Sequence, residues 1–391
     1  MAYKGMSPES PRSKVVYLFG AGASHACVMA AGLSFGILMR DLSDPLREKV
    51  EGIVADKYPD EPTIAALVNA VITDDADVEH IITFLDQSIS SLHKRFAEDL
   101  RVAFESVLGA RLERIEEELG GPPVNLYEAV LDLHQVEGVG EELTGMLTLN
   151  CDQYIEAAIA LAGREVDLGI DLGQDAALPA YTLLKLHGSF GWKHSWLVSL
   201  GAGYAAPLWI PPGIQKKKDD YPFNLLWGRA RELLDCDVLR IVGCRLGPND
   251  WDLISLLFTT RHTNARRDQA YRIEVINSPK TVVDLQERHP YLDVSSFLEQ
   301  EPVGSRLISE LLGGVPRPYS SLTPEALSLL NERGTNANWF RLWLIHTAEA
   351  IYEAGGSLAT PRGVLRGLME ARWRGQGDCP MDGNGTSQSI C

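Results

Sequence analysis

A buried strand that ends in two glycines and opens a helix is the feature that most constrains this chain. Residues 15–24 read VVYLFGAGAS, a run of apolar, β-favouring residues followed by Gly20-Ala21-Gly22 and two small residues. Glycines at such a junction let the backbone approach a pyrophosphate, and the amides of a helix N-terminus favour negative charge. The third glycine of the dinucleotide-binding fingerprint is absent, because His25 stands there. The stretch therefore predicts either a phosphate site or a tight turn after a core strand.

Strands and helices alternate along the chain, which predicts an α/β fold with a mainly parallel, doubly wound sheet. The first strand is expected at residues 14–19 and its helix at residues 23–31. In such sheets ligands bind in the crevice beyond the carboxyl ends of the strands. Further strands are expected at residues 144–149, 181–186, 208–212, 238–242 and 272–276, and helices at 125–135, 153–161, 224–234 and 251–258.

Long amphipathic stretches interrupt this alternation after the first strand and helix. Between residues 36 and 118, apolar residues recur at three- and four-residue spacing with no strand-like pattern, which predicts a large helical insertion. Further helices, including 336–354 and 361–374, predict a helical C-terminal extension. The expected organisation is a flexible arm at 1–13, an α/β domain at 14–35 and 125–300, an insertion at 36–124, a helical region at 301–374 and a disordered tail at 375–391.

Composition and charge exclude several classes of protein. The net charge of -17 over 391 residues argues against a general nucleic-acid or anionic-membrane binder, so no sequence-specific nucleic-acid binding is expected. No apolar run approaches the ~20 residues of a membrane span, and the N-terminus lacks the apolar core of a secretory signal. Both features favour a cytoplasmic protein. The six cysteines form no C-x-x-C pair, which indicates free thiols rather than disulfides or a zinc site.

Polar motifs stand where the expected strands end: TLNCD at residues 148–152, KLHG at 185–188, GCRL at 243–246 and IN at 276–277. Asp152 stands two positions after Asn150, so both side chains can point into the crevice. The alternative for Asn150 is a turn or a helix N-cap. An unperturbed histidine titrates near neutral pH, which suits His187 to the role of general base; the alternative is a packed, hydrogen-bonded histidine.

Together with the turn at residues 20–24, these motifs resemble the sirtuin family, whose motifs read GAGxS, TQNID, HG and G(T/S)SL. The likeness covers most of residues 14–280. It implies a Rossmann-like domain with NAD as substrate, in which Asn150 orients the ribose and a water, Asp152 holds the nicotinamide amide and His187 is the general base. Cleavage of the nicotinamide–ribose bond needs such groups, because it passes through an oxocarbenium-like state.

The resemblance also implies a set of residues that contact NAD. Ser24 and the amides after Gly22 would take ribose and phosphate, and Asn277 is either an adenosine-ribose contact or a turn residue. Cys244 stands where the family has serine or threonine; because a thiol hydrogen-bonds weakly, the backbone would supply a phosphate contact there. Asp250 is a ligand contact or an N-cap. The expected contacts are Gly20, Ala21, Gly22, Ser24, Gly188, Gly243, Cys244 and Asn277.

One departure from protein-deacylating sirtuins is the missing zinc module, since residues 188–242 contain one cysteine, Cys236. No zinc is therefore expected. The zinc-free arrangement with a helical insertion is similar to the sirtuin-like NAD hydrolases of bacterial anti-phage systems, in which infection triggers destruction of NAD. The Asp77-Val78-Glu79 sequence also fits that branch. The lysines at 216–218 indicate a solvated loop, with phosphate or partner binding as the alternative.

An unregulated NAD hydrolase would kill its own cell, so the activity is expected to be gated. The resemblance implies a homo-oligomer and a separate partner, with a HerA-type hexameric ATPase preferred over an Argonaute. The aromatic residues at 339–352 favour core packing, with an assembly surface as the alternative. The predicted function is an NAD glycohydrolase of anti-phage defence. The alternatives are a protein deacylase or ADP-ribosyltransferase, and a non-catalytic module that senses NAD or ADP-ribose.

Overall fold

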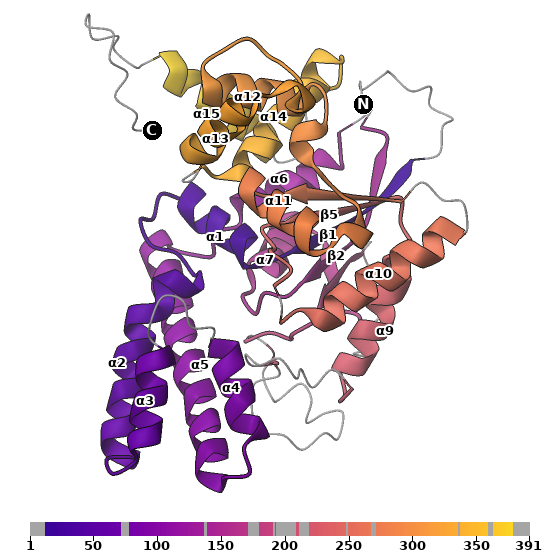
Figure 1. Cartoon of the computed structure of the whole chain (residues 1–391). Coiled ribbons are helices and arrows are strands. Elements are labelled where there is room, and N and C mark those ends of the chain that lie inside the picture. Colours follow the sequence, from indigo (N-terminus) through magenta and orange to yellow (C-terminus); the bar gives the residue numbers. More distant parts are fainter. Residues whose placement is uncertain are drawn as a thin grey trace, which may run out of the picture.

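Seven parallel strands form one central sheet with helices on both of its faces (Figure 1). The computed structural model describes residues 12–71, 78–136, 139–170, 180–190, 192, 209–210, 219–247, 249–266, 271–334, 337–358 and 363–377. The strand order is β3-β4-β2-β1-β5-β6-β7, which confirms the expected doubly wound α/β fold. The strands are β1 (Ser13–Phe19), β2 (Glu141–Thr148), β3 (Glu165–Asp167), β4 (Ala180–Lys185), β5 (Val238–Val242), β6 (Arg272–Ile276) and β7 (Val294–Ser296).

Most of the expected strands are present, and two short strands are present that were not expected. These are the edge strands β3 and β7, which have three residues each, and so short a run shows no periodicity in the sequence. The strand expected at 208–212 lies mostly outside the described residues. Within it, Trp209 forms an isolated antiparallel bridge with Gly188.

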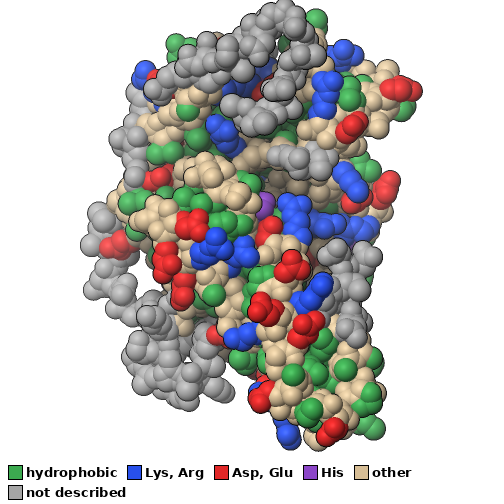
Figure 2. Space-filling model, turned by 90° about the vertical axis from the view of Figure 1, so that its left-hand side faces the viewer, with side chains coloured by type: hydrophobic (Ala, Val, Ile, Leu, Met, Phe, Trp, Pro, Cys, Tyr) green, Lys and Arg blue, Asp and Glu red, His purple; other side chains and the backbone are tan. Residues whose placement is uncertain are grey.

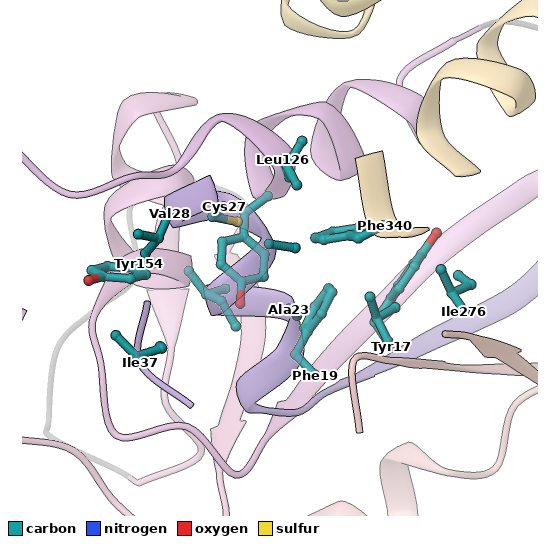
Figure 3. Close-up of a cluster of buried hydrophobic side chains, with 14 of the residues drawn as sticks. Tyr17, Phe19, Ala23, Cys27, Val28, Ile37, Leu126, Tyr154, Ile276 and Phe340 are labelled. Carbon is teal, nitrogen blue, oxygen red and sulfur yellow. The ribbon is translucent and has the colours of Figure 1, made fainter. Parts of the chain in front are cut away.

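The apolar run of β1 is continuous because both faces of the sheet are buried. Val15, Tyr17 and Phe19 face one layer of helices, whereas Val16 and Leu18 face the other. Figure 3 shows Tyr17 and Phe19 beside Phe340 in the first layer. That layer holds α1 (Ala21–Ala30), α6 (Asn125–Leu133), α7 (Tyr154–Leu161) and α14 (Trp339–Glu353). The second layer holds α9 (Phe223–Leu233), α10 (Trp251–Arg266) and α11 (Pro279–Arg288).

A group of helices projects from the sheet between α1 and α6, where the sequence predicts an insertion (Figure 1). Its helices are α2 (Met39–Lys57), α3 (Pro62–Val71), α4 (Val78–Gln87) and α5 (Ser91–Leu119). The 29-residue α5 buries an apolar stripe and ends at Gly120, whose φ of 71° is the left-handed conformation favoured at helix C-termini. Asp77 lies outside the described residues, and the side chain of Glu79 is not described.

Four further helices form the C-terminal part of the chain: α12 (Val303–Leu312), α13 (Pro324–Arg333), α14 and α15 (Val364–Gly377). Of the aromatic residues of α14, Trp339, Phe340 and Trp343 are buried and Tyr352 is exposed, so core packing is the correct use for the first three. The Asp132 carboxylate accepts the amides of Val364 and Leu365 and so joins α15 to α6. The expected tail at 375–391 lies outside the described residues beyond position 377, and the lysines at 216–218 also lie outside them.

A buried arginine on β5 connects that strand with β1, β2 and β6, and through Tyr17 it reaches His134 at the end of α6. The Arg240 guanidinium on β5 binds both carboxylate oxygens of Glu141 at 2.7 and 2.6 Å, Glu274 at 2.9 Å and the Tyr17 hydroxyl at 3.1 Å. The Tyr17 hydroxyl also lies 2.9 Å from Nε2 of His134. Burial lowers the pKa of His134 to about 4, so this ring is neutral near pH 7.

The described part of the chain contains no helix with the length and apolar character of a membrane span.

A histidine between two carboxylates links three of the C-terminal helices. Buried His346 on α14 lies 2.9 Å from Glu310 of α12 and 2.9 Å from Glu349, and Arg372 of α15 donates to Glu310 at 2.6 Å. Burial alone would lower the pKa of His346, but its hydrogen bonds to the two carboxylates outweigh burial and raise it. The same contacts hold the pKa values of Glu310 and Glu349 below their usual range, against the effect of burial.

We predict that this cluster makes the stability of the protein decrease as pH rises. Because the folded-state pKa of His346 is raised, its contribution is complete below about pH 6.5 and is lost as pH rises through the folded pKa. His346→Gln should cost about 1 to 3 kcal/mol at pH 6 and much less at pH 9. Urea unfolding at both pH values measures this. Exposed His262→Gln is the control, and an equal loss from His346→Gln at both pH values would contradict the prediction.

Candidate active site

The adjacent strands β1 and β5 lie at the point where the strand order of the sheet reverses direction, and the loops that follow them meet there. The Gly20 amide donates to Val242 O at 3.0 Å, and the Gly22 amide donates to Gly243 O at 2.9 Å. A Cβ on Gly20 would lie 2.7 Å from the Cα of Cys244, and one on Gly22 would lie 2.6 Å from Gly243 O. The two glycines are therefore required by contact with protein backbone, which fits the tight turn that was the alternative to a phosphate site.

The helix after β1 begins at Ala21, two residues earlier than expected, so Gly22 lies within its first turn. Ala21 is exposed, so the start of α1 faces solvent. The amide of Ala23, the first after Gly22, donates to Gly20 O at 2.9 Å. This amide was expected to meet phosphate, and in the structure it is used within the turn.

A buried cluster of polar groups is centred on Ser24, in the second turn of α1. The Ser24 hydroxyl lies 2.9 Å from Nδ2 of Asn150 and 2.9 Å from the Tyr127 hydroxyl. The same hydroxyl lowers the pKa of the nearby Asp152 carboxyl, against the effect of burial. A serine hydroxyl can accept from Asn150 while it shares a second hydrogen bond with Tyr127, so one atom satisfies both partners. The structure thus brings Ser24, Asn150 and Asp152 together, and it places Ser24 beneath the surface.

Asn150 is held by its amide group. Its Nδ2 donates to Gly20 O at 3.0 Å as well as to Ser24, and its backbone amide donates to the Thr148 hydroxyl at 3.0 Å. Within the part of the chain that the structure describes, Oδ1 of Asn150 has no hydrogen-bond partner. This oxygen is therefore the atom that can accept a hydrogen bond from a ligand or a water.

Asp152 is a buried carboxylate at the start of α7. Its Oδ1 accepts the Tyr154 amide at 3.2 Å. Burial raises the pKa of Asp152, and the nearby Lys185 ammonium and Ser24 hydroxyl oppose this rise. The side chain therefore supports the start of a helix and places an ionisable group close to Asn150.

His187 lies on a loop that is tied to the Asn150–Asp152 segment. Beyond it, the Phe190 amide donates to Cys151 O at 3.1 Å, and the Ser189 hydroxyl donates to the same oxygen at 3.2 Å. His187 is half-buried, and its backbone oxygen accepts the Ile210 amide at 2.7 Å. Gly188 has a φ of 76°, which favours glycine. The two expected catalytic segments are thus joined through Cys151.

The polar atoms of Asn277 hold the loop after β5. Its Nδ2 donates to Cys244 O at 3.3 Å, and its Oδ1 accepts the Ser278 amide at 2.8 Å. This is the turn role that was the alternative to a ribose contact. Cys244 is buried. The Asp250 carboxylate accepts the Gly247 amide at 2.9 Å, within the loop before α10. Its backbone oxygen accepts the Ile254 amide at 2.8 Å, which places Asp250 at the N-cap position of that helix.

Helix α5 of the insertion contacts two segments near this cluster, Trp209 and the loop after α1, and no pattern in the sequence predicts these contacts. Phe104 stacks on Trp209, the bridge partner of Gly188, with ring centroids 6.2 Å apart. The Cζ atoms of Arg111 and Arg114 lie 5.2 and 4.3 Å from the ring centroid of Phe35, in the loop after α1.

The same helix brings charges to this side of the molecule. Burial raises the pKa of Glu116 on α5, and the Asp152 carboxylate adds to the rise. The molecular face in Figure 2 carries a gathering of basic side chains beside a histidine, with acidic side chains around it. This face is thus mixed in charge, although the whole chain carries -17.

Two further residues belong to the site and had no predicted role. Tyr127 on α6 binds Ser24, and no local pattern marks it in the sequence. Lys185 did carry a signal, because it is a charged residue in an otherwise apolar strand. Among the described residues, no group of three or more His, Cys, Asp or Glu side chains could hold a metal ion.

Comparison with known proteins gives little. No protein-family model matches the chain, and no curated protein matches its sequence. One solved structure that it matches is a mutant Sir2 homologue in complex with ADP ribose. The TM-score is 0.31 at 15% identity, with 87% of this chain and 94% of that chain covered. This TM-score is too low to support an inference, so the fold class rests on the sheet order of the chain itself.

We predict that Gly22→Ala destabilises the protein by about 1 to 3 kcal/mol, because its Cβ would overlap Gly243 O. Gly109→Ala is the matched control, since a Cβ there meets nothing within 4 Å and the helix interior favours alanine by roughly 0.5 to 1 kcal/mol. Urea unfolding measures both. Equal free energies of unfolding for Gly22→Ala and the wild type would show that the two loops do not pack as described.

Proposed function

We propose that this chain binds NAD at the carboxyl edge of the sheet and hydrolyses its nicotinamide–ribose bond. The observation that supports this most is the buried cluster that brings Ser24, Asn150 and Asp152 together. The Asn150–Asp152 segment of this cluster is hydrogen-bonded to the His187 loop. These residues come from three strand ends that the sequence relates to NAD chemistry. No resemblance in overall structure is needed for the proposal.

The reaction requires three tasks that these side chains can perform. The C1′–N bond breaks with its electron pair going to the nicotinamide ring nitrogen, and a water oxygen forms the new bond to C1′. In the proposal, Oδ1 of Asn150 orients the ribose and the water, and the Asp152 carboxylate accepts the nicotinamide amide. His187 takes the proton from the water, which suits a group with an ordinary pKa near neutral pH. The products are nicotinamide and ADP-ribose.

We expect Asn150→Ala and His187→Ala each to reduce nicotinamide release by about 100-fold or more, the usual effect of removing a positioned catalytic group. Chromatography of nicotinamide after incubation with NAD measures this, and thermal unfolding checks that each variant is folded. Exposed Asn224→Ala and His262→Ala are matched controls.

Other outcomes separate the alternatives. Full activity in both site variants would refute the site assignment. Release that requires an acetyl-lysine peptide would indicate a deacylase, and ADP-ribose binding without any turnover would indicate a sensing module.

We further propose that the enzyme acts in anti-phage defence and is gated by homo-oligomerisation and a HerA-type ATPase, with an Argonaute as the second choice. The support is the sequence resemblance, together with the harm that uncontrolled NAD loss would cause. NAD cleavage should therefore rise when a HerA-type ATPase is added. Size-exclusion chromatography with activity assays tests this, and equal activity of the isolated monomer would contradict gating.

A further inference from the structure

Lys185, the last residue of β4, is a fully buried lysine two residues before His187. An unpaired ammonium would be very costly in such a place, so its partners show what it does. Its Nζ lies 2.6 Å from Oε1 of Glu156 on α7, and it also donates to the backbone oxygen of Asp152. One buried cation thus links β4, the Asp152 segment and α7.

This ammonium pairs with the Glu156 carboxylate, and the Asp152 carboxylate lies in the same buried region. Oε2 of Glu156 is buried and has no hydrogen-bond partner among the described residues. Burial raises the pKa of Glu156, while Lys185 lowers it and Asp152 raises it further. Burial also raises the pKa of Asp152, and the charge of Lys185 opposes that rise. Both acids thus depend on one buried cation.

We propose that Lys185 is a positioning residue, whose ammonium fixes the Asn150–Asp152 segment and balances the Asp152 carboxylate, with Glu156 as competitor for the same cation. The inference rests on the proposed function, because it assigns Asp152 a role as a charged acceptor for the nicotinamide amide. Lys185 touches no reacting atom. It acts through the Asp152 backbone oxygen and through the charge of the side chain.

The groups around Asp152 come from five elements, and Lys185 is the cation among them. The Ser24 hydroxyl lowers the pKa of the Asp152 carboxyl. The other groups are acids, phenols or thiols whose pKa values rise through burial and through the nearby Asp152 charge. They are Cys27 of α1, Glu116 of α5, Tyr127 of α6, Cys151 before α7, and Tyr154 and Glu156 of α7.

The two partners of Lys185 give a test with opposite signs. Lys185→Met removes the cation, so Asp152 should take up a proton at higher pH, and the ratio of kcat/KM at pH 6 to that at pH 8 should fall about tenfold. Glu156→Gln removes the competing acid, so the same ratio should rise. Exposed Lys280→Met is the control and should leave the ratio unchanged. A purely structural role predicts lower stability with no shift, and shifts of equal sign or none would overturn the proposal.

A second measurement needs no NAD, so it separates failure of this inference from failure of the proposed function. Urea unfolding of Lys185→Met, Asp152→Asn and the double variant at pH 7.5 forms a double-mutant cycle. If Lys185 balances the Asp152 charge, Lys185→Met should lower stability less in the Asp152→Asn background than in the wild type. Additive losses would overturn the inference, whether or not the wild type cleaves NAD. If Lys185→Met does not fold, the pH ratio of Glu156→Gln still decides.

Discussion

The backbone contact between Gly22 and Gly243 determines how the rest of the site is built. Because neither residue has a Cβ, α1 begins directly against the loop after β5, with the Gly22 amide 2.9 Å from Gly243 O. This position of α1 buries Ser24 one turn later, where its hydroxyl meets Asn150 from the end of β2. Asn150 in turn donates to Gly20 O, so the cluster closes on the same turn from which it starts. A side chain at either glycine would displace the helix and, with it, the serine that orients the cluster.

Two buried cations in the sheet show how place determines role. Arg240 lies in the middle of β5, and its planar guanidinium binds Glu274 of the adjacent β6 and the Tyr17 hydroxyl of the adjacent β1. It also binds Glu141 of β2, which lies one strand beyond β1. Lys185 lies at the carboxyl end of β4, where the chain turns into the loop that carries His187. Its ammonium is a compact charge that can be shared between two acids, and one of them is Asp152. The first cation holds the sheet together, whereas the second reaches the edge at which ligands bind in folds of this class.

The sequence predicts the strands that are long, apolar and bounded by Gly or Asn, and it predicts which residues stand at their ends. It predicts β5 and β6 to the residue, whereas the three-residue β7 leaves no periodic pattern to detect. It cannot predict that Tyr127, 103 positions from Ser24 and in an ordinary amphipathic helix, completes the buried cluster. It leaves open why the glycines are paired, because composition cannot distinguish close approach by a ligand from close approach by another loop. The catalytic roles themselves stay predictions, since geometry alone does not test them.

The insertion is more than an appendage, because α5 already contacts the segments on which the proposed chemistry depends. Its Phe104 stacks on Trp209 beside the Gly188 bridge, and Arg111 and Arg114 enclose Phe35 in the loop after α1. Arg111 also donates to Gly36 O at 3.4 Å, so it contacts this loop through both a ring and a backbone oxygen. Packed interiors respond to force by discrete shifts rather than by gradual deformation. A partner or a second copy that moved α5 would therefore act on the His187 loop and on the loop after α1 together. The contacts involved are the Phe104–Trp209 stack and the Arg111–Phe35 contact, so gating by assembly would require no further connecting residues.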